Sequence, residues 1–123
     1  MRRRNVVAFV TPAETPIYVR CGKVIDDIRT IARGHGYAIA VHGSLRRERD
    51  IDLIAAPWTK NAHAPRTLMR AINKLPYLSR VTKHDHDPPK PYGRLGFVWI
   101  IRYRAKDCPS YVDLSVMPKG GGA

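Results

Sequence analysis

The sequence predicts an α+β fold in which a mixed β-sheet has its helices packed on one face. Two segments have apolar residues three and four positions apart, which is typical of amphipathic helices. Six other segments are short apolar or alternating runs, which are typical of strands. The predicted order is strand, helix, strand, strand, helix, strand, strand, strand. Because several strands follow one another through short links, antiparallel pairs within a mixed sheet are expected.

Glycine and proline delimit the predicted elements. Gly34 and Gly36 are expected to end the first helix, Pro65 suits the first turn of the second, and Pro76 should stop it. The predicted helices span Ile17 to Ala32 and Pro65 to Leu75. The predicted strands are Asn5 to Val10, Tyr37 to Val41, Asp50 to Ala56, Tyr77 to Lys83, Leu95 to Tyr103 and Tyr111 to Met117.

Length and composition indicate one globular domain. The chain has 123 residues, of which 44% are hydrophobic. We expect a single domain over residues 5–118, a basic arm over 1–4 and a flexible tail over 119–123. The longest apolar runs are much shorter than a bilayer span, and the run from Val6 to Val10 is too short for a signal peptide. A cytoplasmic protein without a membrane partner is therefore expected, and the oligomeric state stays open.

The charge favours a polyanionic partner. The chain has 22 Lys and Arg against 10 Asp and Glu, a formal charge of +12. Such a balance is typical of proteins that bind nucleic acid, nucleotides or acidic surfaces. The alternative is a basic protein that its charge keeps soluble. Cys21 and Cys108 do not make a disulfide framework in a cytoplasmic domain.

Three aspartates carry the strongest chemical signal. Because strand side chains alternate, Asp50 and Asp52 should point to one face, while Ile51 and Leu53 point into the core. Asp113 occupies an equivalent position in the last predicted strand. If the two strands are neighbours, three carboxylates converge, and clustered anions of this kind repel one another unless a cation holds them. Oxygen ligands with open positions suit Mg²⁺ or Mn²⁺.

A Gly-Ser pair and an arginine-rich link precede the aspartates. Gly43 would let backbone approach a phosphate closely, and Ser44 could offer its hydroxyl or its N–H. Three arginines of the link could hold phosphate charge; they are Arg46, Arg47 and Arg49. The alternative is a solvated turn in which Glu48 pairs with its neighbours.

The motifs occur in the order Gly43-Ser44, Asp50-x-Asp52 and then Asp113 on a later strand. This order resembles the nucleotidyltransferase superfamily, in particular its small single-domain members, the minimal nucleotidyltransferases. The similarity covers about residues 37–58 and 93–118, which contain the motifs. The amino-acid sequence of these segments is also similar to uncharacterised phage and prophage proteins. The resemblance implies that Gly43 and Ser44 position a triphosphate and that the Asp-x-Asp pair binds metal. It also implies that Asp113 completes the site and activates the attacking hydroxyl.

The resemblance implies a metal-dependent enzyme that moves a nucleotidyl group from a nucleoside triphosphate to a hydroxyl on RNA, protein or a small molecule. The chain departs from the family pattern in one respect that favours an alternative function. Family members usually have a longer link between the Gly-Ser pair and the Asp-x-Asp pair than the five residues from Leu45 to Arg49. That alternative is a catalytically degenerate module that binds nucleic acid or a nucleotide on the same fold. A third reading, an interaction protein with an acidic partner, has no sequence feature of its own.

Four further features are ambiguous in sequence. Arg94 could reach a phosphate or a base, or its segment could be a loop that needs Gly93 to turn. The run from His84 to Asp87 is interpreted as a solvated loop rather than a metal site. His42 could face the site or be structural. Trp58 and Trp99 are interpreted as packing residues.

Overall fold

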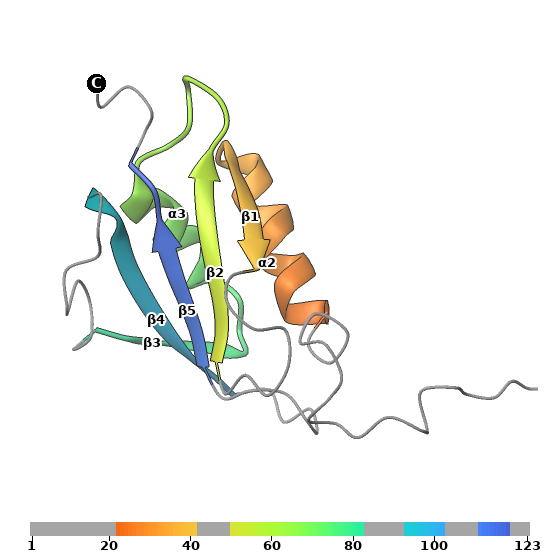
Figure 1. Ribbon diagram of the computed structural model, residues 1–123. Coiled ribbons are helices and arrows are strands. Elements are labelled where there is room, and N and C mark those ends of the chain that lie inside the picture. Colours follow the sequence, from red (N-terminus) through yellow and green to blue (C-terminus); the bar gives the residue numbers. More distant parts are fainter. Residues whose placement is uncertain (1–21, 42–49, 83–92, 103–110, 119–123) are drawn as a thin grey trace, which may run out of the picture.

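A five-stranded mixed sheet and two helices make up the described part of the chain (Figure 1). The computed structural model describes residues 22–41, 50–82, 93–102 and 111–118. The α+β class is therefore confirmed, while the predicted strand from Asn5 to Val10 lies outside the described residues. The elements are α2 (Gly22–Gly34), β1 (Tyr37–Val41), β2 (Asp50–Pro57), α3 (Pro65–Ile72), β3 (Leu78–Val81), β4 (Leu95–Ile101) and β5 (Tyr111–Val116).

The strand order explains why the sheet is mixed. The order across the sheet is β1-β2-β5-β4-β3, and β1 and β3 form its edges within the described residues. β2 and β5 are parallel, whereas the other three neighbouring pairs are antiparallel. The antiparallel pairs predicted for consecutive strands are confirmed for β1 with β2, β3 with β4 and β4 with β5.

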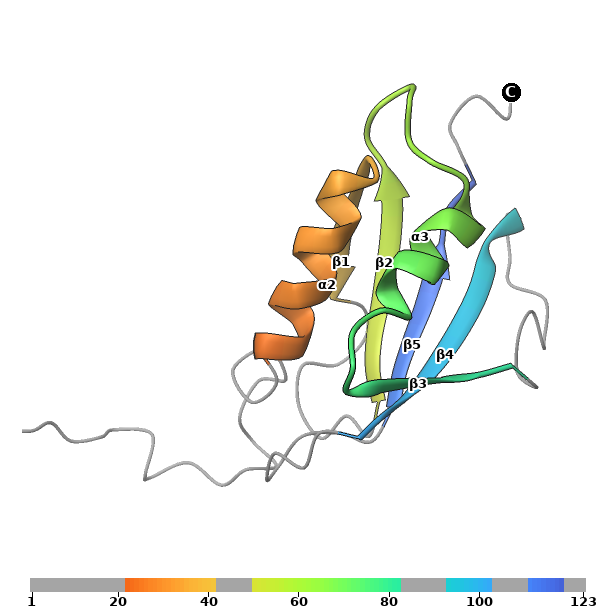
Figure 2. The ribbon, with the colours of Figure 1, turned by 180° about the vertical axis from the view of Figure 1, so that it is seen from behind.

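Both helices lie on one face of the sheet, as the two opposite views show (Figures 1 and 2). The face beneath them is apolar because alternate strand residues point to it. The core contains Ile51 and Leu53 of β2, Leu114 of β5 and both aromatic residues of β4, all at most 1% exposed. The helices contribute Val24, Ile25, Ile28, Ala32, Leu68, Met69 and Ile72.

The predicted helix boundaries agree closely with the structure where it describes them. α2 ends at Gly34, and Gly36 follows in the left-handed region with φ of 88°. α3 starts at Pro65 as expected but ends at Ile72, three residues before the predicted end at Leu75. The chain tightens into a turn there, because the Leu75 N–H donates to the carbonyl of Ile72 at 3.0 Å.

Trp99 and Trp58 have opposite environments. Trp99 is fully buried, and its indole N–H donates to Asn73 Oδ1 at 2.8 Å, so its predicted packing role is confirmed. Trp58 is 62% exposed, so the same prediction for Trp58 is wrong. The reason is that β2 ends at Pro57, the partner of Tyr37, and Trp58 follows after the last paired position.

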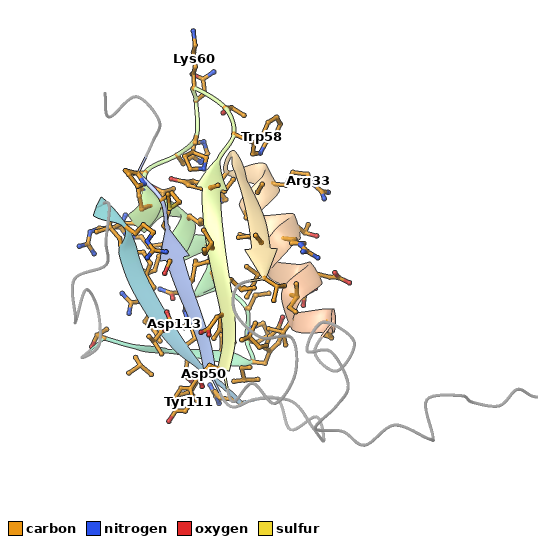
Figure 3. The ribbon with its side chains drawn as sticks, in the orientation of Figure 1. Arg33, Asp50, Trp58, Lys60, Tyr111 and Asp113 are labelled. Carbon is orange, nitrogen blue, oxygen red and sulfur yellow. The ribbon has the colours of Figure 1, made fainter. Side chains whose placement is uncertain are left out.

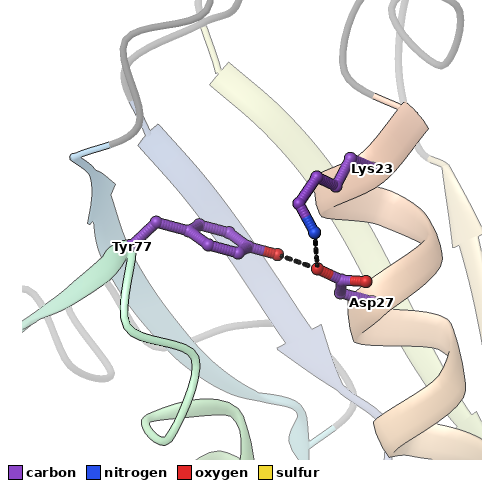
Figure 4. Close-up of polar contacts among 3 residues, drawn as sticks. All are labelled: Lys23, Asp27 and Tyr77. Atoms are coloured by element: carbon purple, nitrogen blue, oxygen red, sulfur yellow. Dashed lines mark hydrogen bonds and ion pairs between the residues drawn. The ribbon is translucent and has the colours of Figure 1, made fainter.

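A polar contact joins α2 to the segment before β3 (Figure 4). The Tyr77 hydroxyl donates to Asp27 Oδ2 at 2.7 Å, and Lys23 Nζ donates to the same oxygen at 3.0 Å. Lys23 Nζ also lies 5.6 Å from the centre of the Tyr77 ring. This three-residue contact connects α2 to the residue that precedes β3, the edge strand opposite β1 in the described part of the sheet.

Candidate functional site

The two aspartate-bearing strands are parallel neighbours. In their register Asp52 lies opposite Asp113, and Asp50 lies opposite Tyr111. Neighbouring strands are about 4.8 Å apart, so the two opposed aspartates have adjacent backbones. The neighbourhood of the strands, on which the predicted convergence of Asp50, Asp52 and Asp113 depends, is therefore present.

The three carboxylates lie on the face of the sheet that α2 and α3 do not cover. Ile51, Leu53, Val112 and Leu114 alternate with them and are buried beneath the helices. Figure 3 shows Asp50 and Asp113 at the end of the sheet where β2 begins. All three aspartates are partly buried. Each of them therefore keeps part of its surface exposed.

Among the described strand residues on this face, the neighbours of the carboxylates are uncharged. Val98 of β4 lies opposite Asp113 on its other side, and Ser115 is 7% exposed two positions farther along β5. Tyr111 is 43% exposed at the start of β5. A hydroxyl, a phenol and apolar surface therefore flank the acidic residues.

Among the described side chains, no group of three or more His, Cys, Asp or Glu is close enough to hold a metal ion. Each of the three aspartates also interacts with another group already. The opposed pair Asp52 and Asp113 fits Mg²⁺ or Mn²⁺ by ligand type, because both ions prefer carboxylate oxygens and complete their shells with water or phosphate.

The phosphate-binding half of the predicted site lies outside the described residues. Its predicted residues are Gly43, Ser44, Arg46, Arg47 and Arg49. The ends of their connection are described: Val41, the last residue of β1, pairs with Leu53, and the connection returns to Asp50. It therefore leaves and re-enters the sheet at the carboxylate end of β2.

Arg94 lies away from the carboxylates along the sheet. It directly precedes β4, whose first residue, Leu95, pairs with Val116. Val98, the residue of β4 opposite Asp113, is four positions after Arg94, which is about 13 Å at the usual rise of a strand. Gly93 has φ of 73°, as expected of a residue that turns the chain before β4.

Sequence reasoning missed a pair of histidines. His35 and His63 have their Nδ1 atoms 2.6 Å apart, and their rings meet edge to face with centroids separated by 4.7 Å. Burial, then the charges of His63 and Lys74, lower the pKa of His35 below its ordinary value. The two histidines are 28 positions apart without a shared motif, so the sequence contained no signal for their contact.

Sequence reasoning also missed a pocket beside the edge strand β1. It has a volume of about 430 Å³ and is lined by Arg29, Arg33, Tyr37, Ala38, Ile39 and Trp58. The tryptophan was interpreted as a packing residue, and the two arginines were not singled out. The i, i+4 spacing of the two arginines was the one available signal.

Comparisons of the chain with known protein families, with curated proteins and with solved structures found no match. Within the described ranges, no helix is long and apolar enough to cross a membrane.

Proposed function

We propose that the protein is a metal-dependent nucleotidyltransferase that uses Asp50, Asp52 and Asp113. The observation that carries the proposal is the register of β2 and β5, which sets Asp52 opposite Asp113 with Asp50 on the same face. The order Gly43-Ser44, Asp50-x-Asp52, Asp113 supports it, because it resembles the nucleotidyltransferase superfamily. The nucleotidyltransferase-like topology of the sheet is part of this proposal.

In the proposed reaction an acceptor hydroxyl oxygen attacks the α-phosphorus of a nucleoside triphosphate. The bond from that phosphorus to the oxygen bridging to the β-phosphate breaks, and pyrophosphate leaves with the electron pair. Asp50, Asp52 and Asp113 would hold Mg²⁺ or Mn²⁺, and Asp113 would also accept the proton of the hydroxyl. The bound ion would supply positive charge to the triphosphate oxygens. Gly43, Ser44, Arg46, Arg49 and Arg94 are the proposed nucleotide-binding residues.

The experiment measures transfer from labelled nucleoside triphosphates with Mg²⁺ or Mn²⁺ and candidate acceptors, including transfer RNA. We expect Asp52→Asn and Asp113→Asn each to reduce transfer at least about 100-fold, equivalent to about 2.7 kcal/mol of transition-state stabilisation. Asp26→Asn is the matched control, because Asp26 is an exposed acid on α2. Transfer that is equal in the wild type and the Asp50→Asn, Asp52→Asn double variant would refute the proposal.

The second candidate is a module on the same fold that binds nucleic acid or a nucleotide without chemistry. It is favoured by the +12 charge and by the short link from Leu45 to Arg49 between the Gly-Ser pair and the Asp-x-Asp pair. It predicts salt-dependent binding to nucleic acid that survives the Asp50→Asn, Asp52→Asn double substitution. Loss of binding at low salt in the folded double variant would exclude it.

A further inference from the structure

The pocket beside β1 lies at the opposite end of the sheet from the carboxylates. Trp58 follows the last residue of β2, whereas Asp50 is its first residue. Eight positions of extended chain correspond to about 26 Å. Figure 3 shows Trp58 and Arg33 together at this end and Asp50 at the other. A ligand in the pocket would therefore not touch the proposed catalytic residues.

The position of Trp58 is well defined although its ring is exposed. Its backbone N–H donates to the Gly36 carbonyl at 3.0 Å, which joins the end of β2 to the turn before β1. The side chain is 62% exposed and lines the pocket. An exposed tryptophan on a defined backbone presents a flat aromatic surface that a planar ligand can stack on.

Arg29 and Arg33 supply positive charge to the same pocket. They lie one helical turn apart on α2, about 6 Å along its axis, and therefore on one face of the helix. Like charges at this spacing destabilise a helix. The dipole of α2 accounts for a cation at Arg33 in the last turn but not for Arg29 one turn earlier. An anionic ligand between them would offset this repulsion.

The charges of the described residues are segregated in a way that favours such a ligand. Lys60 is exposed in the loop that follows Trp58, at the same end of the sheet (Figure 3). No acidic residue is present in the ranges 28–41 and 53–82. The acidic residues of the described ranges are Asp26, Asp27, Asp50, Asp52 and Asp113. Counted over the described residues, the pocket end therefore has the more positive charge.

We propose that this pocket binds single-stranded nucleic acid, with one base stacked on Trp58 and the flanking phosphates held by Arg29 and Arg33. Aromatic stacking beside basic side chains is how proteins hold single strands without reading their sequence. The bases of a duplex cannot enter the pocket, because they are already stacked and paired. Tyr37, Ala38 and Ile39 provide apolar surface beneath the base. This binding does not depend on any reaction at Asp50, Asp52 or Asp113.

The test measures the affinity of the full chain for a fluorescently labelled oligouridylate of about twelve nucleotides, a length within the range that single-strand-binding folds cover. Trp58→Ala should weaken binding about 5- to 150-fold, which corresponds to 1–3 kcal/mol for one stacked base. Trp58→Phe keeps a ring and should retain most of the affinity. Thermal unfolding of each variant checks that it is folded.

The arginines are tested by charge-matched pairs. Arg29→Gln with Arg33→Gln should weaken binding and lower the slope of log affinity against log salt by about 1.4, which is two lost phosphate contacts. The control pair is Arg70→Gln with Lys74→Gln, which removes equal charge at equal spacing from exposed positions in and after α3. A control pair that weakens binding as much as the pocket pair would overturn the proposal, as would unchanged binding by folded Trp58→Ala.

Two further arms separate this proposal from its alternatives. The Asp50→Asn, Asp52→Asn variant should bind the oligouridylate like the wild type, so loss of transfer activity and loss of strand binding are distinguishable. A duplex of the same length should bind more weakly and without sensitivity to Trp58→Ala. If uridine monophosphate displaces the oligomer at concentrations near the dissociation constant of the oligomer itself, the pocket is a mononucleotide site and the commitment to a strand is wrong.

Discussion

Asp52 and Asp113 occupy opposed positions on two parallel neighbouring strands, so two carboxylate residues lie side by side on the helix-free face of the sheet. Like charges directly opposite each other across neighbouring strands disfavour the fold. A divalent cation that binds both would convert this repulsion into attraction. The stability of the protein should therefore depend on divalent cations if the proposed metal site is correct.

The first prediction concerns addition and removal of metal. Millimolar Mn²⁺ or Mg²⁺ should raise the midpoint of thermal unfolding, and a chelator should reverse the rise. At ten times the dissociation constant the stabilisation is about 1.4 kcal/mol. Asp52→Asn and Asp113→Asn should abolish the response, whereas Asp26→Asn should keep it. An equal response in all four proteins would show that the cation acts elsewhere.

The second prediction concerns the hydrogen bond from Tyr77 to Asp27. This bond, more than the neighbouring Lys23, lowers the pKa of Asp27 below its ordinary value, against the opposing effect of burial. A depressed carboxyl pKa contributes stability above the unfolded pKa, near 3.9, and loses it as the pH falls through the lower folded value. Tyr77→Phe should therefore cost about 1 kcal/mol near pH 7 and progressively less at pH 4 and below.

Urea unfolding at several pH values measures this effect. The double variant Tyr77→Phe, Asp27→Asn completes a cycle, and we expect the Tyr77→Phe cost to vanish in the Asp27→Asn background. Lys23→Gln is the control for the exposed ion pair and should cost less, about 0.3–0.5 kcal/mol. A Tyr77→Phe cost that is independent of pH would mean that the ring packs without acting through Asp27.

The third prediction concerns the pair His35 and His63. At a separation of 2.6 Å one Nδ1 donates and the other accepts, so full protonation of both rings would set two donors against each other. Because the pKa of His35 is lowered on folding, the folded state binds its proton less well than the unfolded state does. Stability is complete above the ordinary value, near 6.5, and should decline as the pH falls below it.

The measurement is a nuclear magnetic resonance titration of the His35 ring together with unfolding at pH 7.5 and 5.5. His35→Gln should flatten the pH dependence of stability in that interval. Lys74→Gln should move the pKa of His35 back toward its ordinary value, because Lys74 is one of the charges that lower it. Titration of His35 at or above its ordinary value would contradict the prediction.

Periodicity predicted most of the described fold because burial on one face leaves a period in the sequence. Alternation around Ile51 and Leu53 identified the core face of β2, and the strand from Tyr37 to Val41 was predicted with its observed bounds. By the same alternation, Asp50 and Asp52 were assigned to one face. That β2 and β5 are neighbours was assumed and not predicted, since no local pattern in the sequence selects a distant partner strand.

The features that sequence reasoning missed depend on tertiary contacts or on chain ends. Trp58 was interpreted as a packing residue, but it follows the last paired residue of β2 and is 62% exposed. His35 and His63 meet only because the loop after β2 folds back onto the turn before β1, where the His63 N–H donates to the His35 carbonyl at 2.9 Å. Neither arrangement leaves a spacing that sequence can reveal.

The fourth prediction contrasts the two tryptophans. Trp99→Ala should destabilise the protein by about 3–5 kcal/mol, because it empties a fully buried site and leaves Asn73 Oδ1 without its indole donor. Trp58→Ala should change the free energy of unfolding by about 0.5 kcal/mol or less, as for most surface positions. Urea unfolding measures both, and comparable losses would show that Trp58 packs in solution.

The last prediction concerns Gly36, whose carbonyl accepts the N–H of Trp58. A Cβ at Gly36 would lie 2.7 Å from Ala62 Cα, and its φ of 88° disfavours any side chain. Gly36→Ala should therefore cost about 2–3 kcal/mol and disturb the fluorescence of Trp58.

Two other glycines separate the clash from the backbone strain. Gly93 shares the positive φ, but its Cβ would meet only Pro118 Cγ at 3.8 Å, so Gly93→Ala should cost about 1 kcal/mol. Gly34 ends α2 with open space around it, and Gly34→Ala should be neutral or stabilising by up to about 1 kcal/mol. Equal costs at Gly36 and Gly93 would mean that the loop carrying Ala62 yields, and the turn would then not define the position of Trp58.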